Sequence, residues 1–108
     1  MNDPFLSLLG LSKKSGNAVF GFDTVKFAMQ KGSVKIVFAA CDLSEKTKKE
    51  LLFYCNKTKT EYIETVYDKK TLGSSIGKET GIIAVTDKGF AERLKQIKPN
   101  LANVEDNK

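Results

Sequence analysis

Two short apolar runs constrain the fold of this chain most. VKIVFAA covers residues 34–40 and is rich in β-branched residues, and GIIAVTD covers residues 81–87. Strands that are apolar along nearly their whole length are typical of sheets buried on both faces. TEYIETVY, residues 60–67, alternates polar and apolar residues, and residues 17–20 could add a short strand. The pattern predicts a sheet of about four strands with a layer on each face.

Amphipathic segments with capping residues alternate with these strands. The predicted helices cover residues 3–13, 22–31 (ending at Gly32), 44–57, a short segment from Asp68 to Gly77 that carries Leu72 and Ile76, and a last segment after Asp87 that carries Phe90, Leu94 and Ile97. Either Asp42 or Ser44 could cap the third helix, whose Leu51, Leu52 and Cys55 are expected to face inward. The alternation predicts an α/β fold, a three-layer α/β/α sandwich with a mixed sheet of about four strands.

Length and composition suit a small intracellular domain. The chain has 108 residues, of which 1–98 are expected to form one domain and 99–108 a flexible C-terminal tail. We expect neither a signal peptide nor a membrane span, because no apolar run is long enough. Two cysteines, Cys41 and Cys55, with no histidine and no metal-ligand spacing indicate free thiols in the cytoplasm, although a disulfide between them is conceivable.

The charge permits a polyanionic partner and the sequence argues against catalysis. The formal net charge is +5 and the pI is about 9.2, which allows nucleic-acid binding without requiring it. No histidine is available as a general base, and no pair of carboxylates stands out. GSSIGKET lacks the spacing of a phosphate-binding loop, and Glu79 follows Lys78 where that motif needs Ser or Thr. We therefore expect no enzyme, no cofactor and no metal site.

FGFDTVKFAMQKG, residues 20–32, raises a more specific question. On a helical wheel the core-facing stripe comprises Phe22, Val25, Ala28 and Met29. The opposite face carries Asp23, Thr24, Phe27 and Lys31, with Lys26 and Gln30 on one flank. Phe27 is therefore predicted to point outward near the start of a helix, where N–H groups attract phosphate and an aromatic ring can stack on an unpaired base.

A second interpretation of Phe27 is a protein contact. An exposed phenylalanine needs no function, and the tail or a partner could cover it. In this interpretation Phe27 belongs to an apolar patch that docks another protein or a second copy of the chain.

Three segments, in this order, resemble a known family. LLGLSKKSGNAVFGFDTV, KGSVKIVFAACDLSEKTKK and TLGSSIGKETGIIAVTDKGFA make residues 5–95 similar to the ribosomal protein family that includes L7Ae and L30e, and in particular to its small bacterial YlxQ-like branch. The resemblance implies a compact α/β/α domain that binds structured RNA, often kink-turns, in ribosomes or related particles.

The resemblance also implies where RNA would bind. In the family the second helix starts with Gly-x-Asn-Glu-x-x-Lys, and a loop before the last strand packs on a flipped-out nucleotide. Here Gly21 matches the glycine, while Asp23, Thr24 and Phe27 stand at the other three positions, and the loop corresponds to Lys78, Glu79, Thr80, Gly81 and Ile82. We expect Lys13, Lys14, Lys26 and Lys31 to surround the same edge. The three substitutions and Glu79 alter the chemistry, since ionised aspartate only accepts hydrogen bonds and Phe27 removes a cation.

Overall fold

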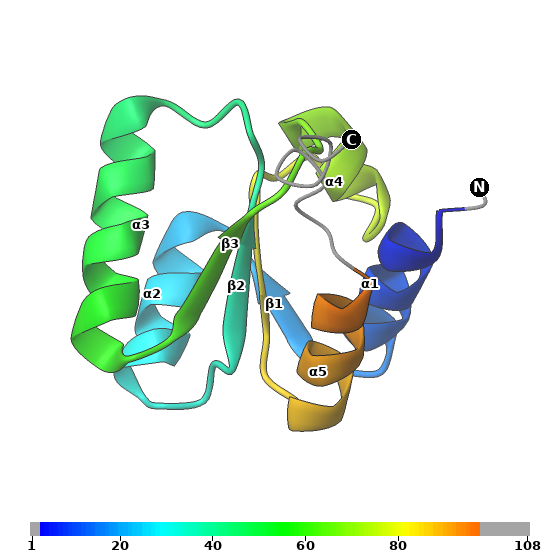
Figure 1. The fold of residues 1–108 in the computed structure, drawn as a ribbon, viewed down its shortest axis with the longest axis horizontal. Coiled ribbons are helices and arrows are strands. Elements are labelled where there is room, and N and C mark those ends of the chain that lie inside the picture. Colours follow the sequence, from blue (N-terminus) through cyan, green and yellow to red (C-terminus); the bar gives the residue numbers. More distant parts are fainter. Residues whose placement is uncertain (1–2, 98–108) are drawn as a thin grey trace.

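Four strands and five helices build the part of the chain that the computed structural model describes, residues 3–97. The elements in chain order are α1 (Pro4–Lys14), β1 (Ala18–Phe20), α2 (Phe22–Gln30), β2 (Ile36–Ala39), α3 (Glu45–Thr58), β3 (Glu61–Glu64), α4 (Lys69–Ser74), β4 (Ile82–Val85) and α5 (Lys88–Gln96). The sheet has the order β1-β4-β2-β3, with β2 parallel to β3 and β4 antiparallel to both of its neighbours. α2 and α3 cover one face of the sheet, and α1 and α5 cover the other (Figure 1). The predicted three-layer sandwich with a mixed sheet is confirmed.

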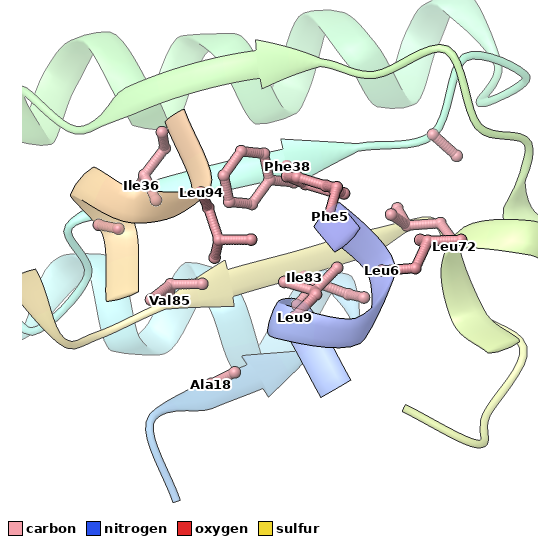
Figure 2. Packing of buried hydrophobic residues seen from close by; sticks show 12 residues of the cluster. Phe5, Leu6, Leu9, Ala18, Ile36, Phe38, Leu72, Ile83, Val85 and Leu94 are labelled. Carbon is pink, nitrogen blue, oxygen red and sulfur yellow. The ribbon is translucent and has the colours of Figure 1, made fainter. Parts of the chain in front are cut away.

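The two central strands explain why both layers are needed. All four residues of β2 and all four of β4 are buried. Successive side chains of a strand point to opposite faces, so Ile36 and Phe38 join the cluster under α1 and α5, whereas Val37 and Ala39 join the cluster under α2 and α3. Figure 2 shows the first cluster, in which Phe38 lies at the centre beside Phe5.

The N-terminal helix is fixed to the sheet by aromatic packing. The ring of Phe5 meets Phe38 edge to face at 5.1 Å between centroids and stacks on Tyr67 at 5.6 Å. The Tyr67 hydroxyl donates a hydrogen bond to Asp3 Oδ2 at 2.7 Å. Because Asp3 Oδ1 also accepts from the N–H groups at the start of α1, one carboxylate caps the helix and ties it to the segment after β3.

The opposite layer packs α2 against α3. Val25 and Met29 of α2 share a buried cluster with Leu51 and Cys55 of α3, and the Cys55 Sγ lies 3.8 Å from the Met29 sulfur. Burial raises the pKa of the Cys55 thiol to about 11. The other cysteine, Cys41, is exposed, and both thiols are free.

One core prediction is wrong. Leu52 was expected to face inward, but 42% of it is exposed. Leu51 and Cys55 are one helical turn apart and define the buried line of α3, and Leu52 lies about 100° further round the helix. The buried cluster between α3, α2 and the sheet includes Leu51 and Cys55 but not Leu52, which stays in solvent.

Several boundaries also differ from the sequence prediction. β3 is shorter than residues 60–67, and α4 ends at Ser74 rather than at Gly77. After α4 the N–H groups of residues 75–77 donate to the carbonyl three residues earlier, so the chain tightens into turns instead of continuing the helix. Ser44, not Asp42, caps α3 by accepting from Thr47 N at 3.1 Å. The predicted tail, residues 99–108, and the domain boundary at residue 98 lie outside the described residues. No helix among residues 3–97 is long and apolar enough to cross a membrane.

Candidate nucleic-acid interface

The start of α2 differs from the start of every other helix in residues 3–97. A side-chain oxygen caps each of the other four helices, and the capping residues are Asp3, Ser44, Asp68 and Asp87. The N-cap of α2 is Gly21, which has no side chain to offer. Its φ of 91° lies in a region that side-chain-bearing residues rarely adopt. The backbone conformation thus selects glycine, and glycine leaves the helix uncapped.

This uncapped end presents free donors. Within residues 3–97, no protein atom accepts a hydrogen bond from the N–H groups of Phe22, Asp23 or Thr24. Such groups carry the positive end of the helix dipole and form a ready site for phosphate oxygens. The side chains of Asp23 and Thr24 are exposed beside them, so a hydroxyl and a carboxylate are available to base amino and imino groups.

The loop before β4 meets this end of α2. β1 pairs with β4 so that Phe20 lies opposite Ile83, and the next residue, Gly21, donates its N–H to the Ile82 carbonyl at 3.0 Å. The predicted site residue Gly21 therefore contacts Ile82, the last residue of the predicted loop of Lys78, Glu79, Thr80, Gly81 and Ile82, and Asp23 and Thr24 lie in the first turn of α2. Lys78 and Glu79 are exposed, whereas Gly81 and Ile82 are buried.

α4 holds the loop in place, a role that the sequence analysis missed. A Cβ on the buried Gly73 would overlap the Lys78 carbonyl oxygen, and the Lys78 N–H donates to the Gly73 carbonyl at 3.1 Å. Asp68 caps α4 by accepting from Thr71 N at 2.8 Å, and this hydrogen bond holds the pKa of Asp68 below its usual value. The signal in the sequence was Gly73, the first glycine of GSSIG, because only a residue without a side chain allows this close approach.

Phe27 points away from the core, as the helical wheel predicted. Its side chain is 62% exposed, the highest value among the large apolar residues exposed in residues 3–97. It lies five residues into α2, about 7.5 Å along the axis from Phe22. The Lys31 ammonium lies 5.1 Å from the centre of its ring. The exposed ring thus lies on the outer face of α2, in the middle of the helix.

Two lysines lie near this end of the molecule. The Lys13 ammonium is 5.7 Å from the ring of Phe20, the residue before Gly21. The Lys26 ammonium is 4.7 Å from the ring of Tyr54 on α3, so it stands on the α3 side of α2.

The other two lysines lie at the C-terminal ends of α1 and α2. The last residue of α1 is Lys14, and the loop after α1 meets the far end of β4, where Thr86 N donates to the Asn17 carbonyl. Lys31 follows the last turn of α2, about 13 Å from the helix start. The Lys31 ammonium nevertheless lies beside the ring of Phe27, and the expectation that all four lysines surround one edge stays a prediction.

No group of three or more cysteine, aspartate or glutamate residues that could hold a metal ion occurs in residues 3–97. The chemistry that the site offers is therefore that of backbone donors, one carboxylate, one hydroxyl, one exposed ring and nearby ammonium groups.

Several known proteins are similar to this chain in sequence, in architecture or in both. The chain is 39% identical over 88 residues to the RNA-binding protein YlxQ of Bacillus subtilis. The matched region covers 81% of this chain and 87% of that protein. A solved structure of a Bacillus halodurans protein of unknown function has a TM-score of 0.82 at 34% identity and covers 89% of this chain and 97% of that chain. The Giardia lamblia 15.5kD RNA binding protein has a TM-score of 0.71 at 15% identity, covering 85% of this chain and 79% of that chain, which shows a common fold.

A family model agrees with these likenesses over most of the chain. The model of the Ribosomal protein L7Ae/L30e/S12e/Gadd45 family matches residues 4–95, a span that contains all four strands and nearly all of the five helices. The chain belongs to the Ribosomal protein L7Ae/L30e/S12e/Gadd45 family.

Proposed function

We propose that this chain is a non-catalytic RNA-binding protein of ribosome-associated type that works in the cytoplasm. It binds structured RNA through the N-terminus of α2 and the loop of residues 78–82. The ribosome is where such an RNA is expected to occur. The observation that carries the proposal is the uncapped start of α2 at Gly21, where three N–H groups lack an acceptor in residues 3–97. The RNA-binding name of the Bacillus subtilis relative supports it.

Each group in the site has a separate task in this proposal. The free N–H groups of α2 bind a phosphate, and Asp23 accepts hydrogen bonds from the amino or imino groups of bases. Phe27 stacks on an unpaired base, and Lys13 and Lys78 neutralise neighbouring phosphates. Unlike asparagine, ionised Asp23 cannot donate, so the site is adapted to RNA whose facing groups are donors.

Fluorescence anisotropy with three RNAs tests the proposal. A kink-turn hairpin, a straight hairpin of equal length and an unstructured strand are titrated with the protein at several salt concentrations. We expect structured RNA to bind most tightly, with a log–log salt slope of about −2 to −3 if three phosphates are neutralised. No binding of either hairpin at low salt would refute the proposal.

A pair of charge reversals locates the binding surface. Lys78→Glu and Lys88→Glu change the net charge equally, and both lysines are exposed. Lys78 lies in the loop that enters β4 at the end where Ile82 accepts from Gly21, whereas Lys88 begins α5 beyond the other end of β4. We expect Lys78→Glu to weaken RNA binding at least fivefold and Lys88→Glu to change it less than twofold. Equal losses would mean that only net charge matters.

A second candidate function rests on the exposure of Phe27. A ring that is 62% exposed could dock another protein or a second copy of this chain. Sedimentation velocity separates the two functions. A concentration-dependent dimer that Phe27→Asp abolishes would favour the protein contact, and a monomer at all concentrations would speak against self-association.

A further inference from the structure

A groove opens between α2 and α3, next to the uncapped start of α2. Its volume is about 300 Å³, and it is lined by Phe22, Lys26, Lys49, Glu50, Phe53 and Tyr54. Phe22 is the first residue of α2. The groove therefore continues directly from the surface proposed above to bind structured RNA.

Aromatic rings from both helices line the groove. Tyr54 touches Phe22 and Phe53 edge to face, at 6.4 Å and 5.2 Å between ring centroids. Phe53 itself is 58% exposed. This exposure leaves ring surface of Phe53 on which a flat ligand can stack.

Ammonium groups surround these rings. Lys26 lies 4.7 Å from the Tyr54 ring and Lys57 lies 6.0 Å from the Phe53 ring, while Lys49 lines the groove. None of these three lysines forms an ion pair within residues 3–97. Glu50 is the one carboxylate among the lining residues, so the lining carries two positive charges against one negative charge, and Lys57 adds a third ammonium group near Phe53.

This combination fits unpaired nucleotides better than an apolar peptide. Bases stack on aromatic side chains whatever their sequence, while lysines follow the phosphates. We propose that a single-stranded extension of the bound RNA runs from the start of α2 into the α2–α3 groove, where one base stacks on Phe53 and its phosphates face Lys26, Lys49 and Lys57. This inference rests on the proposed RNA-binding function and adds a second contact beyond the start of α2.

The test compares one hairpin with and without a four-nucleotide extension, placed on the 5′ end in one RNA and on the 3′ end in another. The proteins are wild type, Phe53→Ala and the control Leu52→Ala, which removes an exposed neighbour on α3 that does not line the groove. We expect one extension to raise the affinity of wild type and of Leu52→Ala at least fivefold, and Phe53→Ala to lose that gain while it binds the bare hairpin normally. Glu50→Gln should enlarge the gain, because it removes the repelling charge.

Other results would overturn the inference. If the extensions add nothing, or add the same to Phe53→Ala as to wild type, the groove does not bind the RNA strand. If the bare hairpin does not bind at all, the function proposed for α2 fails. The groove is then tested with the free four-nucleotide strand. Binding of this strand that is lost in Phe53→Ala supports the groove as a nucleotide site, and no binding overturns it. Dimerisation that depends on Phe53 without any effect on RNA would assign the groove to a protein partner instead.

Discussion

Phe27→Ala is expected to weaken RNA binding while leaving the stability of the fold almost unchanged. The ring is 62% exposed, and the Lys31 ammonium lies 5.1 Å from its centre. An exposed cation–π contact contributes about 0.5–1 kcal/mol, and substituting alanine improves helix propensity by about 0.5 kcal/mol. The two effects nearly cancel, so the free energy of unfolding should change by less than about 1 kcal/mol.

The expected loss of RNA affinity is larger. Stacking of one base on an aromatic side chain is worth about 1–3 kcal/mol, which corresponds to a Kd about 5 to 150 times higher. Urea unfolding measures the stability, and anisotropy with the hairpin that binds wild type best measures Kd at one salt concentration. The salt slope should not change, because no charge is removed. An unchanged Kd in a folded Phe27→Ala protein would refute the stacking argument and remove Phe27 from the site.

Three further experiments test the fold. Leu51→Ala should destabilise the protein by about 2–5 kcal/mol, because Leu51 is fully buried, whereas Leu52→Ala should cost less than about 0.5 kcal/mol; equal urea midpoints would contradict the packing described for α3. Tyr67→Phe should cost about 1 kcal/mol through loss of the hydrogen bond to Asp3, measured in the same way, and no loss would mean that this contact does not stabilise α1. Burial raises the pKa of Cys55 from 9.0 to about 11, so the folded state favours the neutral thiol; its contribution is complete below pH 9 and is lost as the pH rises toward 11. The urea midpoint should therefore fall between pH 8 and pH 10.5, and fall less in Cys55→Ala; identical pH profiles would argue against a buried thiol.

The sequence was most informative where one residue pattern has one structural solution. The run of residues 34–40 could only be a strand buried on both faces, and β2 is fully buried. The wheel of residues 22–31 placed Val25 and Met29 in the core and Phe27 outside, as observed. In both cases local periodicity determines which face is covered.

It was less informative where the answer depends on how elements meet. The periodicity of residues 44–57 does not show how wide a stripe of α3 is covered by neighbouring elements. The prediction that Leu52 faces the core is therefore wrong. The positions of Lys14 and Lys31 depend on which end of β4 each helix terminus reaches, which follows from the sheet order. The groove next to Phe53 exists only because α2 and α3 pack side by side. Non-local pairing decides all of these features, and a single sequence does not display it.

The central claim is that the uncapped start of α2 is the RNA-binding end of the molecule. Amide chemical-shift changes on titration with hairpin RNA test this directly, since each N–H reports its own environment. The account predicts the largest shifts at residues 21–24 and 78–82. Shifts concentrated in α5, with the amides of residues 21–24 unmoved, would contradict it.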